Sequence, residues 1–478
     1  MIIIQNHDIV QQNKSHIAFI VSSGIITGMN AKKNKRSFRR GIRPIRLLPI
    51  GYLAIILLGT LMFMLPVSSA AGPMGFMDAL FTVVSASCVT GLSTIDVANE
   101  LSSFGQAVLL LLIQVGGLGF MTFATVLFGV LRRNLTLLGR MSAAEALGED
   151  GTGRVKELCA CAIKYSIVIE LIGAAVLYIR FRGSFAPLKA LWFSVFHSIS
   201  AFCNAGFDLM GNFESFTRYC CDPLVCLTLS ALIILGGIGF AVIHELMHAR
   251  KLSPLSQHTK TVLVTTAALL IAGFVFNLAA EWSNPGTFAE LSVPNKLLAA
   301  WFQSATLRTA GFNTVDQLAL RDGTKLFNAI LMFIGGAPAG TAGGIKVTSL
   351  AVLLLTTRAF LRNSPNTTIF GRSVSPFAVR RALCVFFIGL SAALLSIAAI
   401  SFAMPDAGFI NTVYEVFSAI GTVGLSAGIT SAAPDAVKLL LCMLMFIGRA
   451  GILTVALAIG GKSNEAILRY PEGNIMIG

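Results

Sequence analysis

The sequence is poor in charged residues. Asp, Glu, Lys and Arg make up only 12% of its 478 residues, whereas 55% are hydrophobic and the mean hydropathy is +0.78. Soluble domains carry about 25% charged residues, so this composition excludes a soluble globular protein and indicates an integral membrane protein. A net charge of +14 would favour a nucleic-acid partner in a soluble chain. Here the basic residues lie between long apolar segments, so we assign them to membrane topology and expect no nucleic-acid binding.

Motifs for redox chemistry and for ATP hydrolysis are also missing. None of the nine cysteines forms a CxxC pair, although Cys220 and Cys221 are adjacent. We interpret all nine as packing residues, and we expect no disulfide framework, no resident metal and no covalent cofactor. The chain has no P-loop either, which excludes an ATP motor of that type.

What the chain does have is one pattern repeated four times, centred on Gly91, Gly206, Gly311 and Gly424. These glycines lie 115, 105 and 113 positions apart, which indicates a repeat of about 110 residues. An aromatic residue stands ten positions before each glycine: Phe81, Phe196, Trp301 and Tyr414. Six positions before each glycine stand Ser85, Ser200, Ala305 and Ser418.

Each copy predicts a short helix that runs into a tight turn which glycine permits. The copies are too short and too polar to cross a bilayer, yet each lies between two long apolar segments, which is typical of a re-entrant loop lining a cavity. Four such loops around one axis would present rings of carbonyl oxygens to a dehydrated cation, and Thr-Val-Gly at 422–424 matches the start of the potassium-channel filter signature. The candidate filter residues are Val89, Thr90, Gly91, Asn204, Ala205, Gly206, Thr309, Ala310, Gly311, Thr422, Val423 and Gly424.

Eight apolar segments flank the four loops. They are residues 47–67, 104–130, 162–180, 225–246, 261–280, 325–361, 382–404 and 436–460. We therefore predict an all-α integral membrane fold of eight transmembrane helices, arranged as four helix–pore-loop–helix repeats around a central pore. The repeats are 47–130, 162–246, 261–361 and 377–460, between an N-terminal segment, 1–46, and a C-terminal tail, 461–478.

The charges predict the orientation. Residues 32–46 hold eight basic residues and no acid, and further basic residues follow the second, fourth, sixth and eighth segments. Acidic residues concentrate on the filter side. By the positive-inside rule both termini are cytosolic and the filter loops face outward. Residues 1–30 fit neither a span nor a signal peptide, and Met29 is an alternative start of translation, which leaves open whether 1–30 is translated.

The second helix of each repeat carries a glycine cluster: Gly116-Gly117, Gly236-Gly237, Gly335-Gly336 and Gly448-Arg449. Small residues let membrane helices approach closely, so we interpret the pattern as packing. The third copy departs from it, because five glycines and one proline put roughly 8 kcal/mol against a continuous helix. We expect a break there, with a loop that gates the pore. The candidate gate residues are Gly335, Gly336, Pro338, Gly340, Gly343, Gly344 and Lys346, together with Arg449.

Arg449 stands where the other repeats have glycine. A cation in an apolar span costs about 2.5–3.5 kcal/mol, so Arg449 is expected to face the pore and to bind the carbonyls that the broken helix exposes. The alternative is an arginine that reaches the cytosol. Glu170, also inside a span, we assign to a helix–helix contact.

A different class of function is suggested by residues 244–248, which read His-Glu-Leu-Met-His. Histidines at i and i+4 share a helix face and could bind zinc with the glutamate as base, as in an intramembrane metalloprotease. Catalytic zinc needs a third protein ligand, and no motif supplies one. We therefore expect no enzyme activity and interpret the motif as a helix end.

Taken with the gate loop, Arg449 and the ending Arg-Tyr-Pro-Glu, the filter motifs resemble those of the membrane subunits of bacterial Ktr-type potassium uptake systems (KtrB-like), in the Trk/Ktr/HKT superfamily. The resemblance covers about residues 32–478; Trk-type members carry two further N-terminal spans that this chain lacks. It implies potassium uptake across the bacterial cytoplasmic membrane by a homodimer in lipid, each protomer with its own pore, and an intramembrane gating loop opposed by an arginine. It also implies a cytosolic ring of nucleotide-binding RCK subunits (KtrA-like) and, often, dependence on sodium.

Two alternatives keep this fold. One is a sodium-selective or sodium/potassium-cotransporting member. Plant relatives with serine at the first filter position favour sodium, and four glycines favour potassium. The other concerns the mechanism: a potential of about 150 mV supplies roughly 3.5 kcal/mol per charge, enough for downhill uptake, so channel and symporter both remain open. The regulating nucleotide is likewise open.

Overall fold

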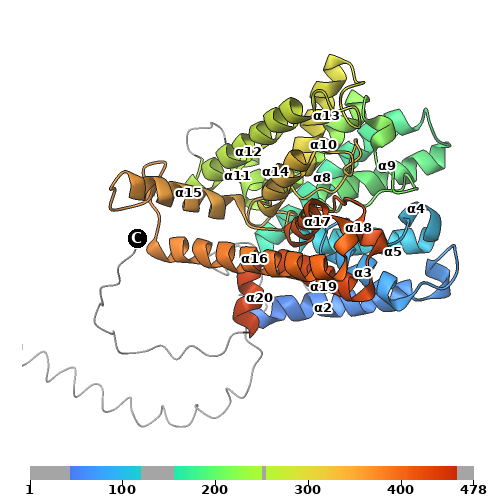
Figure 1. Ribbon diagram of the computed structural model, residues 1–478, viewed down its shortest axis with the longest axis horizontal. Coiled ribbons are helices and arrows are strands. Elements are labelled where there is room, and N and C mark those ends of the chain that lie inside the picture. The colour runs from blue at the N-terminus through green and yellow to red at the C-terminus, as the bar shows by residue number, and fades with distance from the viewer. Residues whose placement is uncertain (1–43, 120–154, 250–254, 460–478) are drawn as a thin grey trace, which may run out of the picture. The chain divides into compact units, whose positions relative to one another are not determined.

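The computed structural model describes residues 44–119, 155–249 and 255–459 (Figure 1). The predictions for residues 1–43, for the end of the first repeat after residue 119 and for residues 461–478 lie outside these ranges.

In the first two ranges the helices are α2 (Pro44–Phe63), η1 (Pro66–Ser68), α3 (Phe76–Ser87), α4 (Val97–Glu100), α5 (Ser103–Leu118), α8 (Val155–Phe181), α9 (Pro187–Phe202), η2 (Thr217–Tyr219), α10 (Pro223–Gly237) and α11 (Phe240–His248). In the last range they are α12 (Gln257–Glu281), α13 (Val293–Thr306), α14 (Asp322–Phe333), α15 (Val347–Leu361), α16 (Pro376–Ala403), η3 (Pro405–Ala407), α17 (Phe409–Gly421), α18 (Ile429–Ala432), α19 (Asp435–Ala450) and α20 (Ile452–Ile459). The described strands are β1 (Thr368–Ile369) and β2 (Arg372–Ser373), an antiparallel pair. The protein is therefore mainly helical, as predicted.

Several long helices begin at a capping side chain. The hydroxyl of Ser102 accepts from the N–H of Gly105 at 3.1 Å at the start of α5. Asp222 caps α10 in the same way, and Ser256 and Ser375 cap α12 and α16. An N-cap acceptor satisfies one of the backbone donors that a helix leaves free at its start, so these residues fix where the apolar helices begin.

Three described helices have the length and composition to cross a membrane: Cys159–Phe181, Gln257–Glu281 and Pro376–Ala403. The pair α10 and α11 would make a fourth, with a bend of 99° between its halves. The other apolar helices of the described part, such as Ser103–Leu118, are shorter.

Two of the predicted second helices are divided by breaks that the sequence interpretation missed. It predicted continuous helices over 225–246 and 436–460, but α10 gives way to α11 at Gly239 and α19 to α20 at Gly451. These glycines have φ of +90° and +91°, and Gly119, which follows α5, has φ of +82°. A left-handed residue ends a right-handed helix, and glycine adopts that conformation without steric cost. The prediction of continuous helices was wrong at both positions.

The first glycine of each cluster does serve packing. A Cβ on Gly116 would collide with the carbonyl oxygen of Ser87, four residues before the first filter glycine. Gly236 lies in the same way against Phe202, and Gly448 against Ile420. The packing interpretation is confirmed in these three copies, where the glycine lets the second helix touch the end of the short helix α3, α9 or α17.

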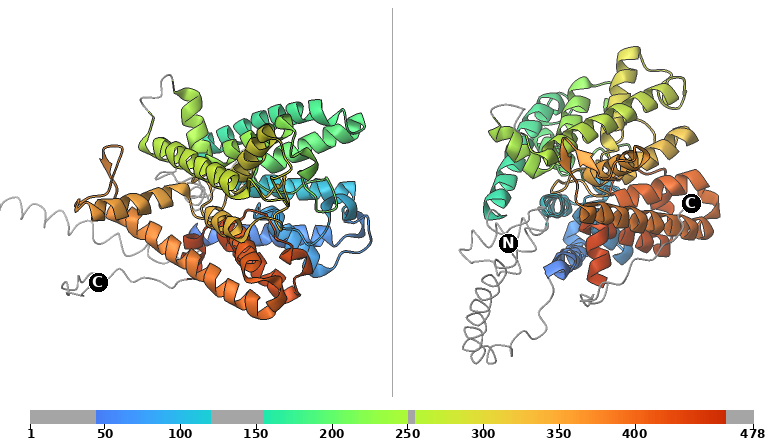
Figure 2. Two further views of the ribbon diagram at one scale, coloured as in Figure 1. Left: turned by 45° about the horizontal axis from the view of Figure 1, so that its top comes forward. Right: turned by 90° about the vertical axis from the view of Figure 1, so that its left-hand side faces the viewer.

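The four repeats, called units one to four and described over residues 47–119, 162–246, 261–361 and 377–459, contact one another in a closed cycle. The first and fourth lie side by side, with α19 packed on α3 and α20 on α2 (Figures 1 and 2). The linking contacts are Asn212 N to Asp96 Oδ2 (2.6 Å), Phe216 N to Asn313 O (2.9 Å), Tyr414 Oη to Gln317 Oε1 (2.7 Å) and Lys438 Nζ to Asp78 Oδ1 (2.8 Å). They join units one and two, two and three, three and four, and four and one.

Glu170 makes the expected helix–helix contact. The amide of Gln114 on α5 donates to both of its carboxylate oxygens, at 3.1 and 3.3 Å. Glu170 lies on α8, so the contact ties the first unit to the second. A buried carboxylate held by an amide is less costly than an unpaired one, which explains how the span tolerates it.

Candidate functional site: a ring of four glycine loops

Four short helices lead into the glycine loops: α3, α9, α13 and α17. Each ends between three and five residues before its filter glycine. The carboxyl end of a helix carries a partial negative charge of about half an electron, from carbonyls without helical partners. Four such ends directed at one place favour a cation there.

After each of these helices the backbone enters the left-handed region, with positive φ, at two positions. Two residues before each filter glycine the backbone is left-handed: Val89 (φ +56°), Asn204 (+57°), Thr309 (+66°) and Thr422 (+52°). The filter glycines are left-handed too: Gly91 (+98°), Gly206 (+70°), Gly311 (+83°) and Gly424 (+97°). Alternating hands turn successive peptide groups to the same side. A left-handed Val or Thr costs about 1–2 kcal/mol, so recurrence of this conformation in all four loops marks the loops as one structural device.

The N–H groups of these loops point back to their own helices. Thr90 N donates to Ser85 O and Val423 N to Ser418 O, both at 2.8 Å. Ala205 N and Ala310 N make corresponding bonds to the ends of α9 and α13. Within the described residues, no carbonyl oxygen of the twelve candidate filter residues accepts a hydrogen bond. The loops thus keep their acceptors free.

The four loops close into a ring. A Cβ placed on Gly91 would lie 2.6 Å from Ala205 O, one on Gly206 2.8 Å from Ala310 O, and one on Gly311 2.5 Å from Val423 O. A Cβ on Gly424 would collide with Thr90 O, which returns to the first loop. Each glycine therefore lies against the carbonyl group of the residue just before the glycine of the next loop. The loops follow one another around the ring in chain order. The twelve residues that the sequence singled out do come together.

Side-chain hydroxyls brace the ring. Ser85 Oγ accepts from Gly91 N at 3.0 Å, and Ser418 Oγ accepts from Gly424 N at 3.1 Å. Ser200 Oγ donates instead to Phe207 O at 2.7 Å. In the third loop the predicted position is Ala305, which has no hydroxyl, and Thr306 takes the role by donating to Phe312 O at 2.6 Å.

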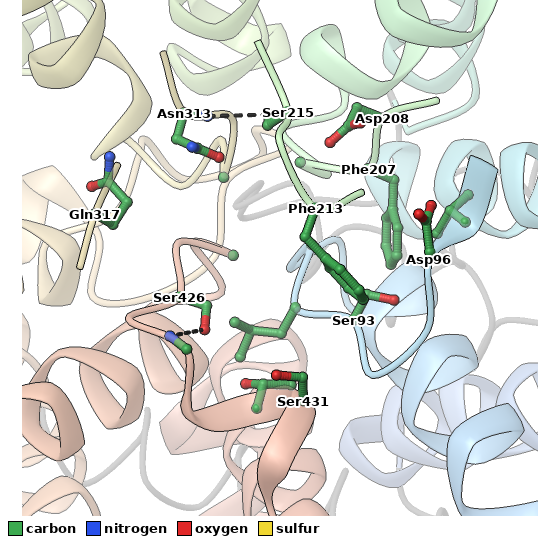
Figure 3. Close-up of a pocket in the computed structure, with 18 of the residues that line it drawn as sticks. Ser93, Asp96, Phe207, Asp208, Phe213, Ser215, Asn313, Gln317, Ser426 and Ser431 are labelled. Carbon is green, nitrogen blue, oxygen red and sulfur yellow. Dashed lines mark hydrogen bonds between the residues drawn. The ribbon is translucent and has the colours of Figure 1, made fainter. Parts of the chain in front are cut away.

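Outside the ring lies a cavity of about 310 Å³ that all four glycines line. Asp96, Asp208 and Asp316 contribute to its wall, and no Lys or Arg does. Figure 3 shows Asp96 and Asp208 on the same side of the opening and Phe213 extending across it. Negative charge around a concave mouth raises the local concentration of cations.

A buried polar network behind the ring was not anticipated. Glu415 on α17 accepts from Ser426 Oγ (2.8 Å), Ala427 N (3.0 Å) and Thr430 N (3.2 Å). Its carboxylate therefore ties the segment after Gly424 to the pore helix. The signal was present in the sequence, since a glutamate stands directly after the aromatic marker at 414.

The second helix of the third repeat is broken, as predicted, between α14 and α15. Ile334 and Ile345 pair as an isolated parallel bridge at the base of the resulting loop, with Gly335 N donating to Ile345 O at 2.8 Å. A Cβ on Gly335 would collide with Gly343 O. The loop is a compact folded turn, which requires glycine at its neck.

This loop contacts the second and fourth units. Ala337 N donates to Gly237 O at 2.8 Å, and Phe240 N donates to Ala339 O at 3.0 Å. A Cβ on Gly343 would collide with the hydroxyl of Thr422, a filter residue. The loop therefore lies directly against the filter ring on the side where the second helices break.

Arg449 binds carbonyls, as expected. Its Nη1 donates to Thr341 O on the loop, and its Nη2 donates to Gly116 O and, at 2.9 Å, to Gly117 O of α5. The bonds to Gly116 O and Gly117 O were not predicted. Lys346 has a local partner instead, with its Nζ donating to Ala342 O at 2.7 Å.

The comparisons with known proteins follow this geometry. A family model described as TrkH, cation transport protein, matches residues 52–466. The chain belongs to the TrkH family of cation transport proteins. It is 41% identical over 435 residues to Ktr system potassium uptake protein B of Bacillus subtilis, covering 91% of this chain and 97% of the relative. It is 38% identical over 454 residues to the potassium/sodium uptake protein NtpJ of Enterococcus hirae, covering 93% and 99%. The crystal structure of the potassium transporter TrkH from Vibrio parahaemolyticus has the same fold, with a TM-score of 0.70 at 17% identity over 90% of this chain and 87% of that one.

Membership of the TrkH family decides against the protease alternative, because its relatives are ion transporters. The motif has structural contacts instead. Glu245 accepts from Ser256 N at 2.5 Å and from Ser256 Oγ at 2.7 Å at the start of α12. His244 Nδ1 lies 3.3 Å from Tyr165 Oη. Among the described residues no group of three or more His, Cys, Asp or Glu could hold a metal ion.

We expect His244→Ala and Glu245→Gln to leave ion uptake within about twofold of wild type. Glutamine retains an acceptor for the Ser256 hydroxyl, and a lost hydrogen bond of this kind costs about 1 kcal/mol of stability. The check is initial uptake rate at matched membrane amount, with zinc measured in the purified protein by elemental analysis. One tightly bound zinc per chain would revive the protease alternative.

External acid is expected to weaken cation capture at the outer cavity. The pKa of Asp208 is raised to about 6, chiefly by burial and to a smaller extent by the charge of Asp96, while the hydrogen bonds from Met210 N and Ser215 lower it. As pH falls through about 6 the carboxylate becomes neutral, so the apparent KM for the transported cation should rise. At every pH, Asp208→Asn should have the KM that the wild-type protein has when Asp208 is protonated. The change in KM near pH 6 should therefore be absent from this variant. A step near pH 6 that persists in Asp208→Asn would assign it to another group.

Proposed function

We propose that this chain is the membrane subunit of a bacterial potassium uptake system and that the glycine ring is its selectivity filter. The observation that carries the proposal is the closed ring in which each filter glycine faces the carbonyl before the next one. Free carbonyls turned to one side can replace the hydration shell of a cation. Four helix carboxyl ends at the ring and an acidic outer cavity add favourable charge.

The proposed arrangement around this filter is eight membrane crossings in four repeats. Two crossings per repeat are supported by the cycle of contacts between the units and by the broken second helix of the second repeat, since α10 and α11 together have the length of a span. The filter then faces outward and both termini face the cytosol, as the positive-inside rule predicts. The names of the relatives support the bacterial cytoplasmic membrane as the location.

The loop between α14 and α15, with Arg449, is the proposed gate. Arg449 belongs to the fourth unit and binds carbonyls of its two neighbours in the cycle, the first and the third. The loop that it holds also contacts Thr422 of the ring, so the guanidinium lies next to the ring. There a fixed guanidinium repels potassium and blocks the path while the loop is in place.

The proposal includes partners and a second ion. We also propose a homodimer that works with a cytosolic nucleotide-binding RCK subunit; the name of a relative, a protein of a Ktr system, supports the presence of further components. Such a subunit would open the gate from the cytosolic ends of the helices. The similarity to a potassium/sodium uptake protein favours, as second candidate, a member that also carries sodium.

The test is uptake in a bacterial strain that lacks its own potassium transporters, with the chain expressed alone and with a cytosolic Ktr partner. We expect growth at low external potassium and uptake of potassium well above that of sodium. Uptake of neither ion, with the protein present in the membrane, would contradict the proposal. Equal uptake of both would favour the second candidate.

A further inference from the structure

Thr341 is the point at which the gate loop and the filter meet. All three of its polar groups are engaged, and its side chain is fully buried. Its N–H donates to Gly236 O at 3.2 Å, and its carbonyl accepts from Arg449. Its hydroxyl donates to the side-chain oxygen of Asn204, a filter residue, at 3.1 Å.

Asn204 differs from its counterparts in the other loops. The equivalent residues are Val89, Thr309 and Thr422, none of which carries an amide. The Nδ2 of Asn204 donates to Arg308 O at 2.8 Å and lies 3.4 Å from the hydroxyl of Thr309, both in the third filter loop. This amide thus joins the second loop to the third, and its own oxygen is held by Thr341.

A buried amide depends on having both ends satisfied. Asn204 is fully buried, and Thr341 supplies the hydrogen bond to its Oδ1 within the described residues. If the loop moves aside, that oxygen loses the donor that Thr341 supplies, which disfavours the present orientation of the amide. The link from the second to the third filter loop then weakens, and with it the spacing of the carbonyls of 204–206 and 309–311.

We propose that Thr341 couples the position of the gate loop to the ion selectivity of the filter. This rests on the proposed function, since it takes the ring as the filter and the loop as the gate. With the loop in place, Thr341 holds Asn204 and the filter discriminates best. With the loop displaced, ions pass a filter that discriminates less between potassium and sodium. Thr341 is a positioning residue: it acts through Asn204.

The experiment compares Thr341→Val with Thr341→Ser in the purified protein without its cytosolic partner, in which the loop is in place. Valine keeps the shape and removes the hydroxyl, whereas serine keeps the hydroxyl. Dissociation constants for potassium and sodium are measured by equilibrium binding, and the maximal rate of potassium uptake is measured in proteoliposomes. We expect Thr341→Val to lower the preference for potassium, given by the ratio of the sodium to the potassium dissociation constant, about fivefold, the size expected for one buried hydrogen bond, and Thr341→Ser to restore it. The control is Thr357→Val on α15, whose hydroxyl donates to Leu353 O of its own helix and whose loss should leave the ratio unchanged.

A second variant covers the case in which Thr341→Val does not fold. Asn204→Thr places at 204 the residue found at 309 and 422 and removes the amide, both the oxygen that Thr341 holds and the nitrogen that donates to Arg308 O. It should lower the ratio by a similar factor, and the double variant should lose little more, because one hydrogen bond cannot be lost twice. Additive losses would overturn the coupling.

Two other outcomes would overturn it. A higher maximal rate with an unchanged ratio in Thr341→Val would mean that the hydroxyl only anchors the loop. An equal fall in the preference for potassium in the serine and valine variants would mean that the Thr341 hydroxyl does not set this preference. Failure of the proposed function is seen separately, in the wild-type protein, as absence of discrimination between the two ions.

Discussion

Removing residues 338–341 from the loop between α14 and α15 is expected to raise the initial rate of potassium uptake about tenfold or more. The deletion keeps the Ile334–Ile345 bridge that closes the loop and removes Thr341, which binds Arg449. If the loop blocks the path in most molecules, a shift of about 1.4 kcal/mol toward the open form changes its population tenfold. The shortened protein should also become independent of the cytosolic partner, because nothing remains to be moved aside.

The measurement is potassium uptake at matched membrane amount, with and without the partner. Arg449→Ala should raise the rate in the same direction, while Arg449→Lys should keep a positive charge in place and raise it less. A shortened protein that folds, inserts and conducts at the wild-type rate would show that this loop is not the gate.

Serine at the filter glycines should reduce the ratio of potassium to sodium uptake at least tenfold. A Cβ on Gly91 would lie 2.6 Å from Ala205 O and 2.9 Å from Gly206 Cα, so the second loop must move. A Cβ on Gly424 would collide with Thr90 O, so the first loop must move. The left-handed backbone adds about 1–2 kcal/mol of strain, which is a fraction of the stability of a folded domain, so the protein should still assemble.

Gly371→Ser is the matched control. Gly371 is also left-handed, with φ of +77°, but a Cβ there meets nothing within 4 Å. This variant suffers the backbone strain without crowding another loop. An unchanged ratio in both Gly91→Ser and Gly424→Ser would refute the filter, whatever their effect on the total rate.

Much of the ring could be predicted from the sequence because the residues that determine each loop lie within a short stretch of the chain. The glycine of each copy is required by its own φ and by contact with the next copy, so the same residue recurs at the same offset. The break in the third helix was equally local, since its glycines and proline oppose helix within twelve residues.

The breaks at Gly239 and Gly451 show where such reasoning fails. A glycine that packs a helix closely and a glycine that ends it look the same in sequence, since both need the absence of a Cβ. Gly236 serves packing and Gly239, three residues later, ends the helix. The backbone conformation distinguishes them, and composition does not.

Most contacts between repeats could not be predicted from the sequence. Arg449 was expected to reach the loop carbonyls, and its bonds to Gly116 O and Gly117 O arise because α5 ends at Leu118 and leaves acceptors in its last turn. Thr341 and Asn204 lie 137 positions apart, and neither side chain is unusual by itself. Their role depends on the fold that brings them together.

Ion flux into proteoliposomes of the purified protein tests the central claim most directly, with potassium and sodium supplied separately at equal concentration and equal membrane potential. The account predicts potassium flux about ten times the sodium flux or more for the wild-type protein, a ratio near one for Gly424→Ser, and the wild-type ratio for Gly371→Ser. Equal fluxes of the two ions through the wild-type protein, or a ratio that Gly424→Ser leaves unchanged, would contradict a potassium filter built from the four glycine loops.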